Sequence, residues 1–180
     1  MISRRRMLAA TGALVGATAL CGRSSMGAPG SNSRRIDLVN LHTGERLEIE
    51  YFRDDAYVTE ALAAIDVLLR DFRSGEKHAM DPKLMDYLVD VAAQVGAPPA
   101  YSVISGYRSP ETNERLHERS SGVSQHSLHM QGRAIDVRMT GVSCADLAAR
   151  ARDLERGGVG YYRASSFVHL DTGAFRAWRG

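Results

Sequence analysis

The chain has 180 residues, 44% of them hydrophobic, with 23 basic and 21 acidic side chains and a formal net charge of +2. This length predicts one domain with a substantial core, and the composition excludes a disordered or fibrous protein. Four basic residues, Arg4, Arg5, Arg6 and Arg23, lie in residues 1–28, which contain no acid, so the 23 basic residues fall to 19 without that segment. The remaining net charge of −2 gives no support to nucleic-acid binding, for which a basic face is expected.

Residues 1–28 have the features of an export signal. Three arginines at positions 4–6 precede an apolar run that extends to Leu20, and paired arginines there are typical of a twin-arginine leader. The apolar run is too short for a comfortable membrane span. We expect cleavage near Ala28, a polar tether over residues 29–35, a periplasmic location and no stable membrane span in the protein that remains.

The first half of the domain, which we expect to cover residues 36–180, contains one strand pair and two helices. Apolar and polar side chains alternate over residues 36–41 and 47–52 around a turn at Gly44, which predicts a β-hairpin. Apolar residues then recur every three or four positions over residues 57–72 and again over 81–96. This spacing predicts two packing helices, the second of them opened by Asp-Pro and closed by Gly.

The second half of the domain continues with shorter elements. An apolar strand over residues 101–105 leads into a loop, and a charged helix follows from Pro110 to Arg119. Ser143 resembles the cap of a further helix, and residues 158–162 read as a strand. Together these patterns predict an α+β fold, a single domain with a central, mainly antiparallel sheet flanked by helices, plus the N-terminal hairpin.

The stretch SLHMQGRAID, residues 127–136, contains the residue types of half a metal site. The imidazole of His129 and the carboxylate of Asp136 are ligands that divalent zinc accepts, and Gly132 between them permits a tight turn. From Arg133 onward the pattern alternates with a period of two, which predicts a strand with Asp136 on the face opposite the core.

The stretch FVHLD, residues 167–171, repeats this pattern and presents His169 and Asp171 on one face. If the two strands pair in one sheet, His169 lies beside Asp136 at about 5 Å, and His129 approaches from the turn. Two imidazoles and one carboxylate leave a fourth position open for water, which is the arrangement of a catalytic zinc. Spacing alone also permits a half-buried histidine that only makes hydrogen bonds.

Five positions in this region match the Ser-x-His-x-x-Gly-x-Ala-x-Asp signature of a zinc peptidase family: Ser127, His129, Gly132, Ala134 and Asp136. The chain thus resembles the family that includes D-Ala-D-Ala carboxypeptidases and dipeptidases, relatives of lysostaphin-type enzymes and of the Hedgehog signalling domain. It is most similar to the YcbK/MepK-like murein endopeptidases. That similarity lies in LHTGE at residues 41–45, ISGYRS at 104–109, GGVGYY at 157–162, FVH at 167–169 and DTG at 171–173.

The resemblance implies one zinc ion per chain, held by His129, Asp136 and His169. It also implies hydrolysis of crosslinks between peptidoglycan stem peptides, from D-Ala to meso-diaminopimelate, with the bond from diaminopimelate to diaminopimelate as a second candidate. Arg108 would stabilise the oxyanion or orient a substrate carboxylate. In the D-Ala-D-Ala peptidases of this family a Glu or His lies three residues before the last zinc-binding His, where this chain has Ser166.

That departure leaves the general base unassigned. Asp171 is the best candidate, and it is equally suited to orienting a ligand imidazole. Two other functions stay open: a carboxypeptidase or dipeptidase that acts on D-Ala-D-Ala, and a non-catalytic, zinc-stabilised domain that binds the cell wall. The missing Glu favours the second of these.

Overall fold

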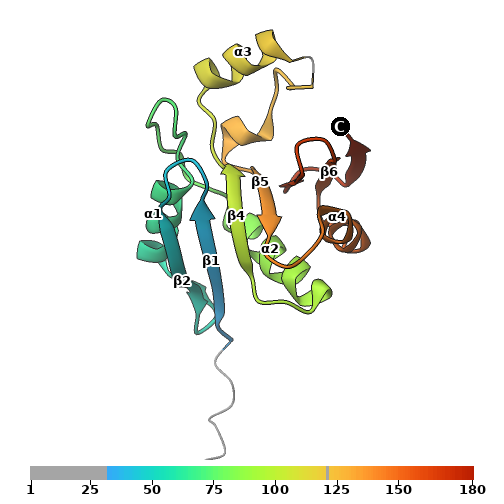
Figure 1. The fold of residues 1–180 in the computed structure, drawn as a ribbon. Coiled ribbons are helices and arrows are strands. Elements are labelled where there is room, and N and C mark those ends of the chain that lie inside the picture. The colour runs from blue at the N-terminus through green and yellow to red at the C-terminus, as the bar shows by residue number, and fades with distance from the viewer. Residues whose placement is uncertain (1–31, 121) are drawn as a thin grey trace, which may run out of the picture.

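In the computed structural model, residues 32–120 and 122–180 are described, so the predicted export signal and the start of the tether lie outside the described residues. The strands in this part of the chain form one eight-stranded sheet in the order β3-β2-β1-β4-β5-β7-β6-β8 (Figure 1). The strands are β1 (Arg34–Asn40), β2 (Arg46–Arg53), β3 (Ala56–Tyr57), β4 (Ala100–Ser105), β5 (Ala134–Met139), β6 (Gly158–Tyr162), β7 (Phe167–Asp171) and β8 (Arg176–Arg179). The helices are α1 (Thr59–Leu68), α2 (Pro82–Val95), α3 (Pro110–Arg119) and α4 (Cys144–Asp153), with a 3-10 turn η1 (Leu128–Gln131).

The predicted fold class is confirmed: the domain is α+β and its sheet is mainly antiparallel. Only β1–β4 and β6–β8 run parallel among the strand pairs of the described residues. The N-terminal hairpin forms from β1 and β2 as predicted, and Gly44 in its turn has a φ of 73°. That left-handed conformation strains residues with a Cβ, which is why a glycine suits this turn.

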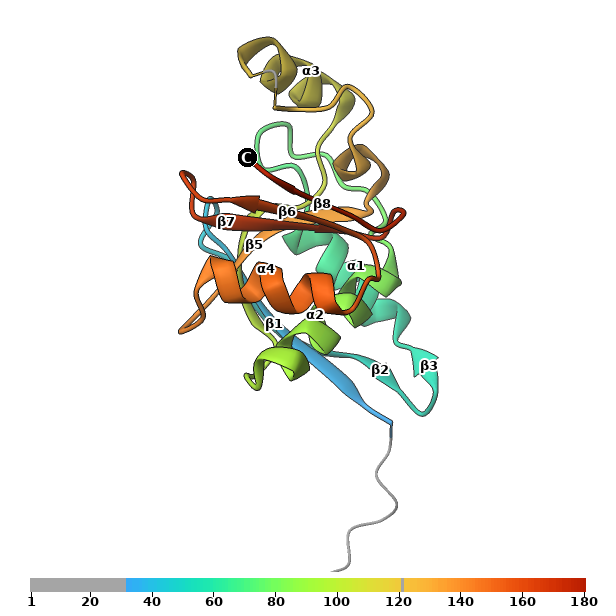
Figure 2. The same cartoon turned by 90° about the vertical axis from the view of Figure 1, so that its right-hand side faces the viewer.

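Helices α1, α2 and α4 cover one face of the sheet, whereas α3 lies beyond the opposite face (Figure 2). Helix α2 supplies the centre of the core with Leu84, Leu88 and Val91, which are all fully buried. Its ends follow the sequence prediction, since Asp81 caps the N-terminus and Gly96 ends the helix with a φ of 74°. The face away from these helices is therefore left free for a site.

The helix predicted over residues 57–72 is shorter at both ends and covers only α1. Tyr57 pairs with Phe52 in the short strand β3 instead. At the other end the carbonyl of Leu69 accepts a hydrogen bond of 2.8 Å from the backbone N–H of Tyr107, and the carboxylate of Asp71 binds the start of α3. Long-range partners thus replace the last helical turn that the apolar spacing favoured.

Two further features bear on the site and on the membrane. The edge strands β3 and β8 were not predicted, because each is too short to show a clear alternation. Among the helices of the described residues, none combines the length and the apolar character needed to cross a bilayer.

Candidate metal centre

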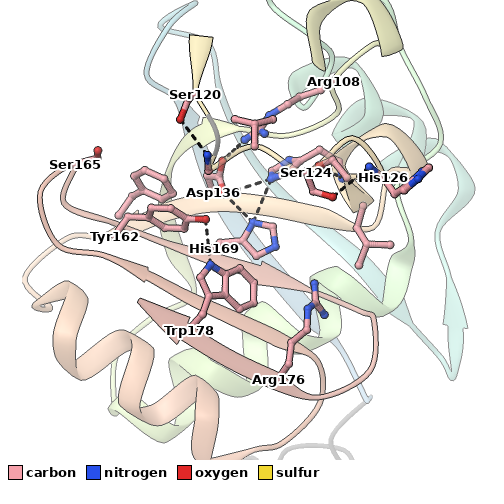
Figure 3. A pocket seen from close by; sticks show the side chains of 16 residues that line it. Arg108, Ser120, Ser124, His126, Asp136, Tyr162, Ser165, His169, Arg176 and Trp178 are labelled. Carbon is pink, nitrogen blue, oxygen red and sulfur yellow. Dashed lines mark hydrogen bonds and ion pairs between the residues drawn. The ribbon is translucent and has the colours of Figure 1, made fainter. Parts of the chain in front are cut away.

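Strands β5 and β7 bring two of the predicted ligands together, because Asp136 lies directly opposite His169 in the strand register. His169 Nδ1 is 2.9 Å from Asp136 Oδ1, and His129 Nε2 is 3.3 Å from the same oxygen. The two imidazole nitrogens are 3.2 Å apart. Side chains from two strands and a 3-10 turn therefore converge on one point (Figure 3).

His129 reaches this point from η1, which ends at Gly132 with a φ of 66°. A Cβ at Gly132 would lie 2.2 Å from the carbonyl oxygen of Ala79. Both the left-handed backbone and this close approach exclude larger residues. The glycine of the sequence motif thus fixes the direction from which the imidazole enters.

Hydrogen bonds on the outer side of each ring determine which nitrogen faces the site. His129 Nδ1 lies 2.7 Å from the carbonyl oxygen of Gly106, which can only accept, so Nδ1 carries the hydrogen and Nε2 has a free lone pair. His169 Nε2 donates in the same way to Asp171 Oδ2 at 2.9 Å. The lone pairs of two imidazoles and a carboxylate oxygen then face one another inside the protein.

The geometry and the burial of these groups fit a bound zinc ion. Tetrahedral zinc with bonds of about 2.0–2.1 Å separates its ligand atoms by about 3.3 Å, close to the distances between the three atoms. The three residues are almost completely buried, with exposed fractions of 1% for His129, 3% for Asp136 and 9% for His169. Buried lone pairs that face one another repel, and a cation between them removes that cost.

The pKa values of Asp136 and His169 favour positive charge at this point, whereas that of His129 keeps its ring neutral, as a metal ligand must be. Burial lowers the pKa of His129 to about 4, and the nearby charge of Arg108 adds to this effect. Burial alone would raise the pKa of Asp136, but His129, His169 and Arg108 hold it well below its usual value. Burial opposes the charge on His169, yet Asp136 and Asp171 outweigh it and raise the pKa. Positive charge is thus stabilised between the His169 ring and Asp136.

Arg108 lies at the edge of the three predicted ligands, where its guanidinium pairs with Asp136 Oδ2. Its Nε donates to Ser105 Oγ at 2.9 Å, and the side chain is 13% exposed. The carboxylate of Asp136 is therefore held from behind by Arg108 while Oδ1 faces the two imidazoles. The guanidinium also forms part of the pocket wall, where a substrate atom can reach it.

Asp171 lies on the outer side of the His169 ring, away from the other ligand atoms, and is completely buried. Its Oδ1 accepts from the backbone N–H groups of Gly158 at 3.1 Å and Gly173 at 2.8 Å. Arg176 donates to both carboxylate oxygens, at 3.0 and 2.6 Å. Burial opposes ionisation, but these donors and His169 lower the pKa of Asp171. The carboxylate is therefore an ionised acceptor that fixes the orientation of His169.

Ser166, where the resemblance to the D-Ala-D-Ala peptidases predicts Glu or His, occupies the turn between β6 and β7. Its φ is 52°, and its carbonyl accepts a hydrogen bond from Arg138. Ser166 does not line the pocket beside the predicted ligands, although its neighbour Ser165 does. Among the described residues that line this pocket, Asp136 is the one carboxylate.

The pocket has a volume of about 510 Å³ and lies over the three predicted ligands. Its far wall contains Trp178, whose ring centroid is 5.2 Å from that of His169, and Tyr162, whose hydroxyl accepts from the indole N–H at 3.1 Å (Figure 3). A Cβ at Gly160 would lie 2.6 Å from the Trp178 ring. The sequence pattern did not predict Arg176 and Trp178 as pocket residues. Their spacing of two residues, which is that of one face of a strand, was the one signal for them.

The family model described as "Peptidoglycan L,D-endopeptidase MepK" matches residues 28–178. Peptidoglycan L,D-endopeptidase MepK of Escherichia coli strain K12 is 38% identical over 176 residues, which cover 98% of this chain and 97% of the relative. A probable peptidoglycan L,D-endopeptidase MepK of Haemophilus influenzae is 39% identical over 148 residues, 82% of this chain and 80% of the relative. No solved structure matches the chain.

Proposed function

Since the chain belongs to the peptidoglycan L,D-endopeptidase MepK family and is a peptidase of peptidoglycan, we propose that it is a zinc-dependent endopeptidase that cleaves crosslinks between stem peptides. The observation that carries the zinc dependence is the set of three buried lone pairs on His129, Asp136 and His169 that face one another. The family assignment alone does not give the ligands, whereas this geometry supports one zinc ion per chain.

The relatives' name also favours one of the two crosslinks that the sequence suggested. A bond from diaminopimelate to diaminopimelate joins the L-centre of one residue to the D-centre of the next, which is an L,D bond. A bond from D-Ala to diaminopimelate joins two D-centres. We therefore propose the bond between two diaminopimelates as the preferred substrate. Because peptidoglycan lies outside the cytoplasmic membrane, we place the protein in the periplasm, with residues 1–28 as its export signal.

In the proposed mechanism each residue has a separate task. Bound zinc would supply a Lewis acid that polarises the scissile carbonyl and lowers the pKa of water. His129, Asp136 and His169 would hold the ion and leave one position free. Arg108 would keep Asp136 in place and present the rest of its guanidinium to the oxyanion of the substrate.

We assign Asp171 a positioning task in place of that of a general base. Its carboxylate lies behind the His169 ring and is fully occupied by backbone and Arg176 donors, so it is turned away from the pocket. By accepting the Nε2 hydrogen it holds His169 in the tautomer that offers Nδ1 to a metal.

The test is a digestion of purified crosslinked muropeptide dimers by residues 29–180. Zinc-loaded protein should convert dimers linked through two diaminopimelates into monomers faster than dimers linked through D-Ala, as measured by chromatography. Metal-stripped protein should be inactive and recover on addition of zinc. His169→Ala should lose activity by about 1,000-fold or more, because a Lewis acid supplies several kcal/mol of transition-state stabilisation.

The matched control is His42→Ala, which removes an imidazole from the β1–β2 turn, where it stacks on Phe72. This variant should keep its zinc and its activity, while circular dichroism checks that both variants are folded. Intact dimers with zinc-loaded wild type would contradict the proposal. Cleavage of pentapeptides ending in D-Ala-D-Ala, with dimers left intact, would favour the carboxypeptidase alternative.

A further inference from the structure

A second concavity of about 270 Å³ lies on α3, and its lining is dominated by arginines. Arg115 and Arg119 come from α3 and Arg73 from the loop after α1, with Thr112 and Leu116 of α3 as the remaining lining residues. We call this surface the arginine groove. Three guanidinium groups thus lie around one hollow in a domain whose predicted mature form carries a net negative charge.

The positive charge of the arginine groove is largely uncompensated. Among the described residues, Glu111 is the one carboxylate in an ion pair with any of the three arginines, and its distance to Arg115 is 3.8 Å with both side chains at least half exposed. Such a pair holds its partner weakly. The Arg73 guanidinium packs over the Phe72 ring at 4.1 Å, so its direction is set by an aromatic face and not by an acid. The groove therefore offers charge to a ligand.

Like charges also act on Arg73 of the groove. Desolvation lowers the pKa of Arg73, and the like charges of Arg108 and Arg115 lower it further, although Asp71 opposes them. Arginine remains protonated in spite of such shifts. An anion bound in the groove would relieve the repulsion between these like charges, because several guanidinium groups would attract it together. The planar fork of arginine also suits a carboxylate.

The arginine groove and the pocket over the predicted metal ligands share the segment at the end of α3. Arg119 lines the groove, and the residues directly after it, Ser120 and Gly122, line the pocket. In Figure 1, α3 lies beyond the ends of β4 and β5. Strand β4 leads into the loop of Arg108, and β5 contains Asp136. The groove and the pocket are therefore joined by a short stretch of chain.

We propose that the arginine groove binds a carboxylate of the peptidoglycan strand at a distance from the cleaved bond. The inference rests on the proposed function for the substrate class, since stem peptides with diaminopimelate carry carboxylates that are not used in crosslinks. Residues of the groove would hold the polymer while a crosslink lies in the pocket. They would contribute to substrate binding and take no part in the bond-breaking step.

The test compares two double variants that remove the same amount of charge. Arg115→Gln with Arg119→Gln removes it from the groove, and Arg35→Gln with Arg150→Gln removes it from exposed positions on β1 and α4. Metal-stripped proteins are sedimented with insoluble peptidoglycan at low salt, and with the same material after its carboxylates have been amidated. Because no bond is cleaved, this measurement holds even if the proposed activity fails.

The groove variant should bind native peptidoglycan about five-fold more weakly than wild type, as expected for the loss of two exposed ion pairs, and the control variant less than two-fold. Amidation should reduce wild-type binding to the level of the groove variant, and 0.5 M salt should have the same effect. With zinc restored, the groove variant should show a raised KM for crosslinked substrate.

Equal binding of the two double variants would overturn the proposal. So would an equal effect of amidation on wild type and on the groove variant, because the carboxylates would then act elsewhere. Vesicles of phosphatidylglycerol provide the remaining arm. If the groove substitutions abolish vesicle binding and leave peptidoglycan binding intact, the groove serves a lipid headgroup and the proposal is wrong.

Discussion

The strand pair β5–β7 lines the pocket, and the helix α3 leads into the pocket wall at Ser120, yet the two are built in opposite ways. On the strands, the polar side chains Asp136, His169 and Asp171 are buried and each has a partner on its outer side. On α3, the buried side chains are Thr112 and Asn113, and the charged side chains face solvent. The chemistry of the site thus rests on a rigid sheet, while the surface beside it carries charge for recognition.

This difference follows from what each task requires. Metal ligands must be held within a fraction of an ångström, which needs side chains fixed by packing and by a second set of hydrogen bonds. Attraction of a charged polymer tolerates looser geometry, because the force between charges falls slowly with distance. We expect substitutions on the strands to change metal affinity and those at the base of α3 to change stability.

Among substitutions that keep the three predicted ligands, the largest effect should come from Asp171→Asn, which removes the charge behind His169 and leaves the shape nearly unchanged. We expect zinc affinity to fall about 10- to 100-fold, as for other partners of metal-binding imidazoles. Competition with a chromogenic chelator measures the affinity, and Asp153→Asn, from an exposed pair with Arg150, is the matched control.

The same variant separates the two tasks that the sequence left open for Asp171. If this residue positions His169, saturating zinc should restore most of the activity of Asp171→Asn. Activity that stays lost at full zinc occupancy, with the acidic limb of the pH profile removed, would show a general base and contradict the positioning assignment.

A smaller effect is expected where α3 is anchored to the body of the domain. Asp71 is buried and accepts hydrogen bonds of 3.0 Å from Ser109 N, Ser109 Oγ and Arg73 N. Asp71→Asn replaces one acceptor with a donor that faces other donors, so the free energy of unfolding should fall by about 2 kcal/mol. Urea denaturation of metal-free protein measures it, and Asp153→Asn should change it by less than about 0.5 kcal/mol.

The effect of Asp71 should also depend on pH. Burial opposes ionisation, but hydrogen bonds to the carboxylate lower its pKa in the folded protein below the value of 3.8. The contribution of Asp71 is therefore complete at neutral pH and is lost as the pH falls below 3.8 toward the folded-state pKa. The difference between wild type and Asp71→Asn should shrink between pH 7 and pH 3. A difference that grows in acid would contradict this anchor.

Much of the strand pair was predictable from the sequence, and its surroundings were not. Alternation with a period of two predicted both strands. The assumption that they pair predicted that Asp136 and His169 are neighbours, and the strand register places them opposite each other. The direction of Asp171 was not predictable, since a residue on the same face as His169 can contact either side of the imidazole. That choice depends on the ring rotation, which Gly158, Gly173 and Arg176 determine through the carboxylate.

Two other errors have a common physical cause. The apolar spacing over residues 57–72 suggested a longer helix, but the backbone after Leu68 is used by the loop before α3. Strand β8 was not predicted, because its four residues form a strand by pairing with β6. The Trp178 ring fits against β6 because Gly160 has no side chain. Contacts between distant segments outweighed local pattern in both cases.

The smallest effect is expected at Ser166, in the hairpin turn that leads into β7. A residue with a Cβ is strained at a φ of 52°, so Ser166→Gly should relieve about 1 kcal/mol of strain, part of which the greater freedom of glycine in the unfolded chain cancels. We expect a gain of up to about 0.5 kcal/mol in urea denaturation, with unchanged zinc affinity and activity. Ser165→Gly, one residue earlier, should give no gain. Lost activity in Ser166→Gly would mean that this turn takes part in the chemistry and that the catalytic site is not confined to the strand pair β5–β7.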